Sequence, residues 1–420
     1  MSIPVSRPHL MLGTRPLVGD TVLRSRAHQW VWRLQSAGLL AFTFMSFFPA
    51  WSHVQEYLFL SLVVMGCAVA YGQQRPLLTP SALNLPIALW LGWILLSVPF
   101  ALDPAYSFGE WRKVVVKVLW FYWALLVLRN TEYKDMEGKV LTAVALGSLG
   151  LCCYALFDFV SRGGILSDRP VRARAPLSDY NWLSSYMVMA VPLLAAGMVR
   201  MPRLPWIVLY AGTAVLALTA QALSFTRAGW LALLSQGLAC GLYFKRVALM
   251  LGIFAGALIT VTLLLVIDVG PFHQDTRDLW TVRARAAVWS LMLQEIGEHP
   301  LVGIGYGTET FMARFGDRPE TIKTKGSHNF FLMTAMGSGI PALAFLLWIF
   351  ATGIRECLRA AHAHVNDPDT AALWVGLALM LVGVAVRNLF DAMFMGSLAC
   401  LFWILLATGL SRIPPRQVSS

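Results

Sequence analysis

Charged residues are scarce in this sequence. Only 13% of the 420 residues are Asp, Glu, Lys or Arg, whereas 57% are hydrophobic. Soluble domains carry about 25% charged residues, so most of this chain cannot face water. Apolar runs of about 20 residues, the length that crosses a bilayer as a helix, recur from end to end. The sequence therefore predicts an all-α polytopic integral membrane protein.

Patterns for disulfides, zinc and secretion are also missing. The six cysteines lie in or at the ends of apolar runs and form no CxxC pair, which argues against a disulfide framework and a zinc site. The basic N-terminal stretch has no small-residue cleavage site, so residues 1–33 are expected to stay as a cytoplasmic arm. The net charge of +11 is better explained by basic cytoplasmic loops than by nucleic-acid binding.

The apolar runs predict about twelve transmembrane helices. They are expected near residues 34–51, 57–72, 83–101, 114–129, 139–160, 180–199, 205–223, 228–244, 247–267, 328–354, 370–388 and 393–411. An even number of spans puts both termini on one side of the membrane. Most short connections on that side are basic, so the positive-inside rule makes it cytoplasmic. Nine spans then occupy 34–267, a periplasmic loop 268–327, three spans 328–411, and a cytoplasmic tail 412–420.

Several arginines on the outward side break the positive-inside pattern. They lie in two loops (Arg162, Arg169, Arg172 and Arg174; Arg277, Arg283, Arg285, Arg314 and Arg318) and at two helix ends (Arg227 and Arg387). Long loops cross the membrane regardless of charge, and an arginine at a helix end can extend to lipid headgroups. The first explanation does not suit Arg227, which lies in a very short connection between apolar helices, whereas contact with headgroups stays open for it. A functional role is therefore favoured there.

Within the large loop, residues 281–297 have the periodicity of an amphipathic helix. Its apolar residues recur every three or four positions, at Val282, Ala286, Trp289, Leu293 and Ile296, with Arg283 and Arg285 at the two edges of the stripe. Such a helix either lies in the membrane interface, with its arginines at the depth of lipid phosphates, or packs over the helix bundle. Periodicity alone leaves both open.

Two further features follow this helix. The glycines of EHPLVGIGYGTETF (298–311) lack the Lys-Ser/Thr pair of a phosphate loop and follow no strand, so a glycine-rich turn is expected. His328 lies where the loop re-enters the membrane. There an imidazole could act as a base or hydrogen-bond donor, or could merely cap the helix or contact headgroups.

An ordered set of short motifs resembles the O-antigen ligase/polymerase family of bacterial envelope glycosyltransferases. The pieces are SFTRAGW (224–230), RAAVW (285–289), HPLVGIGYG (299–307) and SHNFFL (327–332), with weaker similarity at SDYNWLSSYM (178–187) and RNLFDAMF (387–394). The resemblance implies a GT-C-like membrane fold with interfacial helices in the periplasmic loop. It also implies transfer of a glycan from undecaprenyl diphosphate to an acceptor at the periplasmic face of the inner membrane. For a ligase the acceptor is a sugar hydroxyl of lipid A–core, and the process is lipopolysaccharide biosynthesis.

Site residues follow by motif position. Arg227 and Arg285 look like the family's phosphate-binding arginines, and His328 looks like its essential histidine, so these three are the expected catalytic residues. Further candidates for contact with the diphosphate or with acceptor phosphates are Arg172, Arg174, Arg283, Asn181 and Arg387. The resemblance does not cover Arg172 and Arg174. Asp391 is expected to orient an arginine or to end a helix, with a structural role favoured.

The outward loops contain no DxD pair, the pattern with which many glycosyltransferases hold a divalent metal. Arginine binds phosphate oxygens bidentately and stays charged, so the reaction is expected to need no metal and no cofactor. Direct attack of the acceptor on the donor would invert the anomeric centre. The alternatives are an O-antigen polymerase, a protein O-oligosaccharyltransferase and, from another class, a secondary transporter of an anionic substrate. Transporter sites lie near the bilayer midplane, where this chain has almost no ionisable residue.

Overall fold

The computed structural model of the protein describes residues 18–48, 52–76, 79–131, 133–164, 171–246, 280–319, 326–394 and 396–412, with isolated positions 248, 252, 256 and 321. Within these residues the fold is all-helical and contains no strand. The helices of the first half are α1 (Val18–Met45), α2 (Ser52–Gly72), α3 (Asn84–Ser97), η2 (Val98–Phe100), α4 (Pro104–Asn130), α5 (Met136–Ser161) and α6 (Tyr180–Arg200). Those of the second half are α7 (Leu204–Leu223), α8 (Arg227–Tyr243), α11 (Trp280–Glu298), α12 (Thr308–Phe315), α14 (Phe330–Ala363), α15 (Pro368–Asn388) and α16 (Gly396–Leu410).

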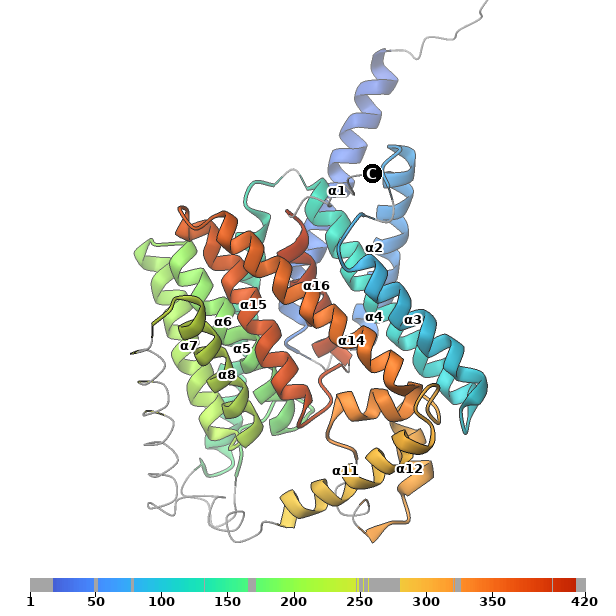
Figure 1. The fold of residues 1–420 in the computed structure, drawn as a ribbon. Helices are drawn as coiled ribbons and strands as arrows, with labels where there is room; N and C mark the ends of the chain where they lie inside the picture. The colour runs from blue at the N-terminus through green and yellow to red at the C-terminus, as the bar shows by residue number, and fades with distance from the viewer. Residues whose placement is uncertain are drawn as a thin grey trace, which may run out of the picture.

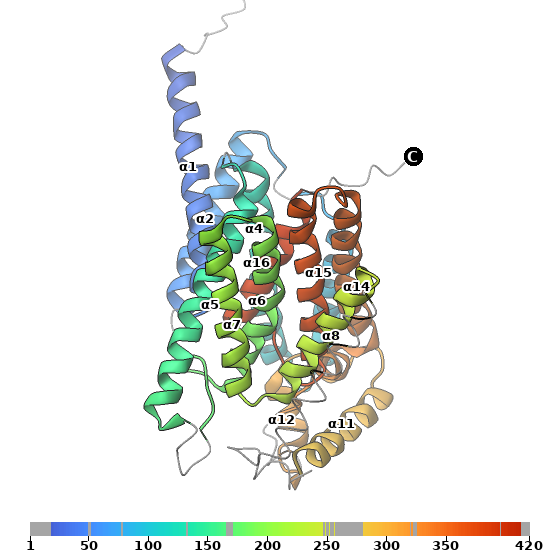
Figure 2. The same ribbon diagram turned by 90° about the vertical axis from the view of Figure 1, so that its left-hand side faces the viewer.

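The long helices form one bundle. Helices α5 to α8 lie on one side and α3 and α4 on the other, with α14, α15 and α16 between them (Figure 1). Helix α6 packs against α7 and α15, and α16 packs against α4. A single large hydrophobic cluster runs through these helices. Helices α11 and α12 lie across the end of the bundle that is opposite to the start of α1 (Figures 1 and 2).

In the described part of the chain, five helices are long and apolar enough to cross a membrane: α5, α6, α7, α14 and α15. Shorter apolar helices occur at Glu56–Gly72, Asn84–Phe100 and Gly396–Leu410. A membrane-spanning helix needs about 20 apolar residues, and satisfies all of its backbone hydrogen bonds internally. The chain is therefore an integral membrane protein, whereas the count of twelve spans stays a prediction.

Most predicted ranges coincide with helices to within a few residues. Three helices extend beyond them: α1 begins at Val18 rather than near 34, α4 begins at Pro104 rather than near 114, and α14 continues to Ala363. These helices are longer than predicted because hydropathy detects only the apolar part of a helix, and the helical turns continue into polar sequence. The start of α4 is fixed instead by Asp103, whose carboxylate accepts a hydrogen bond from the Tyr106 amide at 3.0 Å. The predicted span 247–267 lies outside the described residues.

The glycine-rich turn is confirmed, and it attaches the loop to α14. Gly303 has φ +64°, and a Cβ there would overlap the carbonyl oxygen of Met336. Backbone amides of Ile304 and Gly305 donate to the carbonyls of Met336 and Gly337, each at 2.9 Å. Helix α14 is itself interrupted just beyond, at Gly339. Because only glycine permits this backbone approach, the motif has a structural role in positioning the loop.

The predicted amphipathic helix is confirmed as α11, but a different face packs on the chain. The predicted stripe contained Leu293, which is 57% exposed, and the buried hydrophobic positions are Ala284, Val288, Met292 and Ile296. This face lies against α14. Packing over the bundle is therefore confirmed, and the interfacial depth of the helix stays a prediction. Helix α12 was not predicted, because eight residues are too few for a clear apolar period.

Candidate functional site

His328 lies two residues before the start of α14, and its backbone conformation is strained. Its φ is +47°, in the left-handed region that residues with a Cβ rarely adopt. The next residue, Asn329, is the N-cap of α14, and its side-chain oxygen accepts a hydrogen bond from the Leu332 amide at 2.9 Å. Such strain persists only where the surroundings enforce it, and it is concentrated at functional sites. The His328 side chain is 27% exposed.

One carboxylate connects His328 to a buried arginine. Asp391 Oδ1 lies 3.8 Å from His328 Nδ1, and Asp391 Oδ2 lies 3.0 Å from Arg387 Nη2. The first distance is in the ion-pairing range and longer than a direct hydrogen bond. Oδ1 also accepts a hydrogen bond from the Ala392 amide at 3.0 Å. Three contacts thereby fix the carboxylate, and its Oδ1 atom faces the Nδ1 atom of His328.

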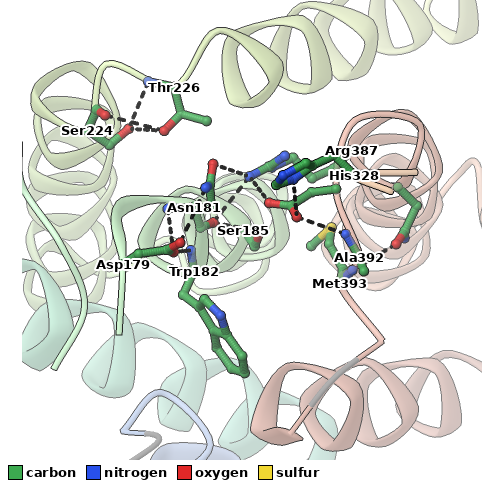
Figure 3. Close-up of polar contacts among 12 residues, drawn as sticks. Asp179, Asn181, Trp182, Ser185, Ser224, Thr226, His328, Arg387, Ala392 and Met393 are labelled. Atoms are coloured by element: carbon green, nitrogen blue, oxygen red, sulfur yellow. Dashed lines mark hydrogen bonds and ion pairs between the residues drawn. The ribbon is translucent and has the colours of Figure 1, made fainter. Parts of the chain in front are cut away.

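Arg387 is held on its other side by the start of α6. Its side chain is 1% exposed, and Nη2 donates to the backbone oxygen and the Oδ1 atom of Asn181, each at 3.3 Å (Figure 3). Asn181 is fixed in turn by Asp179, the N-cap of α6, whose Oδ1 accepts from the amides of Asn181 and Trp182. The ends of α6, α14 and α15 therefore meet at one polar cluster.

Asp391 is ionised throughout the physiological range. Burial raises the pKa of its carboxyl group, but the contact with His328 and the charge of Arg387 outweigh burial and hold the pKa at about 2, below the ordinary 3.8. This negatively charged carboxylate faces Nδ1 of the His328 ring.

Helix α11 is tied to this cluster through Trp289. The indole N–H of Trp289 donates to the backbone oxygen of Ser327 at 3.0 Å, directly before His328. The Trp289 ring also lies 6.3 Å from that of Phe390, beside Asp391. One turn earlier on the same helix is Arg285, half-buried and near enough to Arg387 for their charges to repel each other. The fold thus brings Arg285, Arg387 and His328 to one place.

Arg227 occupies the first turn of α8. Its side chain is exposed, and the preceding turn is held by Ser224 and Thr226, whose hydroxyl oxygens lie 3.1 Å apart (Figure 3). Close packing of α8 fixes its direction: a Cβ at Gly229 would overlap the side chains of Ser184 and Gln221. Arg227 is therefore carried by a rigid helix start at the same end of the bundle as His328.

The two arginines of the 161–179 loop differ in their surroundings. Arg174 forms a two-point ion pair with Asp158, through Nε at 3.2 Å and Nη2 at 3.3 Å, and this contact raises the pKa of its guanidinium group. Arg172 instead lies over the ring of Tyr180, 4.5 Å from its centroid. Tyr180 begins α6 and is next to Asn181, so Arg172 lies beside the cluster. Arg174 is paired with Asp158 of α5 and does not join it.

Arg283 is exposed on α11. The far end of this helix carries the one group of possible metal ligands found among the described residues: Glu295, Glu298 and His299, whose ligating atoms lie within 4.8 Å of one another. Glu295 Oε2 already accepts a hydrogen bond from Arg314 Nε at 2.8 Å. A cation would have to compete with that guanidinium, which disfavours binding.

Two contacts of the cluster were not expected from the sequence: that of Asp391 with His328, and that of the Trp289 indole with the backbone of Ser327. Asp391 was favoured as structural, yet it contacts both Arg387 and His328. Its spacing of four residues from Arg387 was the available signal, because such residues share one side of a helix. Trp289 was assigned to an apolar stripe, and no sequence pattern reveals that its N–H meets the backbone of Ser327.

Comparison with known proteins agrees with the motifs. Residues 212–347 match the protein family described as O-antigen ligase, a range that contains Arg227, Arg285 and His328. The chain is also 25% identical to an O-antigen ligase of Salmonella typhimurium over 385 residues, which cover 84% of this chain and 91% of that protein. The resemblance is therefore confirmed: this integral membrane protein is similar, over residues 212–347, to the O-antigen ligase family and, over most of its length, to an O-antigen ligase.

Proposed function

We propose that the protein is an O-antigen ligase, which transfers a glycan from undecaprenyl diphosphate to a sugar hydroxyl of lipid A–core. Membership of the O-antigen ligase family supports a role in lipopolysaccharide assembly and glycosyltransferase chemistry. The observation that carries the finer assignment is the connected set Arg387, Asp391 and His328, with Arg285 beside it. It combines a base, a residue that orients the base, and a cation for a leaving phosphate.

His328 acts as the general base. Asp391 holds Nδ1, so Nε2 takes the proton from the acceptor hydroxyl as the hydroxyl oxygen attacks the anomeric carbon of the donor. The 3.8 Å separation shortens when the imidazolium forms, since such contacts often tighten only with substrate bound. Positioned base catalysis of this kind contributes roughly 10²–10⁴-fold to the rate. As a single displacement, the reaction inverts the anomeric centre.

The donor diphosphate is held by Arg285 and Arg227. Bond formation at the anomeric carbon breaks its bond to the phosphate oxygen, and undecaprenyl diphosphate leaves with the negative charge. Guanidinium groups stabilise that charge through paired N–H donors. Two further arginines make accessory contacts to phosphate: Arg172, which lies on the ring of Tyr180, and the exposed Arg283. Arg387 supports Asp391 from behind, and Asn181 supports Arg387, so both act by positioning rather than by contact with substrate.

Arginines supply the charge that a divalent metal supplies in many glycosyltransferases. We therefore propose a reaction that needs no metal and no cofactor. This follows from the chemistry of the cluster, in which arginines lie beside the base. The Glu295 group, whose carboxylate is engaged by Arg314, does not take part.

The site faces the periplasm at the surface of the inner membrane. The distribution of charge over about twelve spans in a GT-C-like fold supports this orientation, because the basic short loops lie at the end of the bundle opposite α11. Residues 1–33 and 412–420 are then cytoplasmic, and 268–327 form the periplasmic loop. This places the arginines at the level of phospholipid headgroups, where the diphosphate of a lipid-linked donor lies.

An O-antigen polymerase and a protein O-oligosaccharyltransferase would use the same donor with another acceptor. An anion transporter is less compatible with this geometry, because the ionisable cluster lies at helix ends rather than at mid-membrane.

Reconstitution distinguishes these functions. Purified protein in vesicles is given undecaprenyl-diphosphate glycan and lipid A–core, with EDTA present. Glycan-bearing lipid A–core is the expected product. A lengthened donor glycan would indicate a polymerase instead, transfer to a Ser or Thr hydroxyl an oligosaccharyltransferase, and loss of product in EDTA would contradict the metal-free mechanism.

A further inference from the structure

A separate cavity of about 570 Å³ opens between the N-terminal parts of α2, α4 and α16. Its walls include Trp111, Val115 and Val116 of α4, and Gly396 and Cys400 of α16. None of these residues belongs to the His328 cluster. Helix α4 packs against both α2 and α16, so the cavity lies between elements that are themselves in contact.

Positive charge dominates this cavity. Arg112, Lys113 and Lys117 line it, against one carboxylate, that of Glu56. Lys113 is paired with Glu110 at 2.5 Å, outside the lining. Among the described residues the structure records no ion pair within 4 Å from Arg112 or from the half-buried Lys117. An ammonium group that is partly removed from water and has no carboxylate within ion-pair distance is costly, so a bound anion would stabilise it.

The back wall is rigid and carries a second unused donor. Trp120 is 1% exposed and stacks on Phe59, with ring centroids 3.7 Å apart. Its indole N–H has no acceptor among the described residues. A buried tryptophan N–H usually finds a partner, so this one is consistent with an acceptor supplied from outside the chain. Apolar walls with cationic and N–H donors suit an anionic group attached to an apolar body.

The cavity lies near the start of α6, the helix that carries Asn181. Gly396 lines it, and a Cβ at Gly396 would lie 3.0 Å from the ring of Trp182, the residue after Asn181. Gly396 follows Asp391 by five residues, which span at most about 18 Å. A molecule whose anionic group occupied the cavity could thus extend a sugar to His328.

We propose that this cavity binds a phosphate carried by a membrane lipid, with Lys117 as its main contact, and that this lipid is the acceptor glycolipid. The proposal rests on the proposed function for the identity of the lipid. It assigns donor and acceptor to opposite sides of the cluster: the donor diphosphate to Arg227 and Arg285, and the acceptor phosphate to Lys117.

Binding without donor tests the proposal, because it requires no transfer. Wild-type protein, Lys117→Gln, Lys117→Arg and the control Lys134→Gln are placed in phosphatidylcholine nanodiscs. Lys134 is exposed in the connection between α4 and α5, beyond the other end of α4. The probes are lipid A–core, the same lipid after enzymatic removal of its phosphates, and phosphatidylglycerol. Thermal unfolding confirms that each variant folds.

Lys117→Gln is expected to weaken binding of phosphorylated lipid A–core about tenfold, the usual effect of losing one charged hydrogen bond. Lys117→Arg and Lys134→Gln should bind as wild type does, and the dephosphorylated lipid should not distinguish the variants. If Lys117→Gln weakens phosphatidylglycerol alone, the phosphate site stands and its occupant is a phospholipid. Equal binding of every probe by wild type and Lys117→Gln would overturn the proposal. A Lys117 effect in a protein that makes no product would overturn the proposed function instead.

Discussion

Asp391 presents one carboxylate oxygen to His328, at 3.8 Å, from a separate segment that follows α15. The other oxygen is bound by the buried Arg387 at 3.0 Å. An acid that contacts the proposed base without reaching substrate is a positioning residue. Its effect should appear in turnover and in pH dependence rather than in substrate affinity.

Asp391→Asn should lower kcat by roughly 10²-fold or more, as happens when the acid that orients a catalytic histidine is removed. KM for donor and acceptor should change little, because Asp391 touches neither. Steady-state kinetics in reconstituted vesicles measure both. A rise in KM at unchanged kcat would assign Asp391 to substrate binding.

Asp391→Asn also tests the lowered pKa of the Asp391 carboxyl group. A carboxyl group whose pKa falls from 3.8 to about 2 on folding contributes roughly 2 kcal/mol above pH 4, and this is lost as the pH falls toward 2. The difference in unfolding free energy between wild type and Asp391→Asn should therefore be constant from pH 8 to pH 4. A difference that already shrinks between pH 7 and pH 5 would show that the carboxyl group titrates higher.

Arg387→Met should destabilise the fold, because it leaves the Asp391 carboxylate largely buried without its cation. Breaking a buried pair from one side costs about 3–5 kcal/mol. Arg387→Lys keeps the charge but cannot reach Asp391 and Asn181 together, so an intermediate loss is expected. Thermal unfolding in detergent measures both variants. Unfolding of Arg387→Met at the wild-type temperature would remove Arg387 from the supporting role.

Arg285 and Arg283 form a matched pair on α11. Arg285 is half-buried near Arg387, while Arg283 is exposed. Arg285→Ala should reduce transfer about 100-fold, through loss of charge stabilisation at the leaving diphosphate, and Arg283→Ala less than tenfold. Initial rates at saturating acceptor give the comparison. Equal losses would mean that α11 contributes general positive charge and no specific contact.

Gly303→Ala should lower the unfolding temperature, because a methyl group would overlap the Met336 carbonyl and because φ is +64°. A cost of about 1–3 kcal/mol is expected for the strained backbone alone. Gly297→Ala is the control, since a methyl group there meets nothing within 4 Å. Unchanged stability of Gly303→Ala would contradict the docking of the loop on α14.

Much of the helical framework was predictable, because a membrane helix is specified by one local property. The ranges of α5, α6, α7 and α15 follow directly from hydropathy. The motifs also singled out His328 and Arg285, and the structure places the first beside Asp391 and the second near Arg387, while their catalytic roles stay predictions. These predictions depend on residues adjacent in sequence.

The features that the sequence did not predict depend on contacts between segments that are distant along the chain. The pairing of Arg174 with Asp158 takes that arginine away from the cluster, and the inner face of α11 is set by α14 rather than by its own periodicity. The cavity around Lys117 needs α2, α4 and α16 together, so no single stretch of sequence reveals it. The Arg174 ion pair, the packed face of α11 and the cavity are all consequences of tertiary packing.

The central claim is that His328 performs the proton transfer. The direct measurement is the rate of glycan transfer to lipid A–core in vesicles for wild type, His328→Ala and His362→Ala, the last altering an exposed histidine at the other end of α14. His328→Ala should lose about 10²–10⁴-fold in rate while still binding undecaprenyl-diphosphate glycan, and His362→Ala should transfer as wild type does. Transfer by His328→Ala within threefold of the wild-type rate would contradict the central claim.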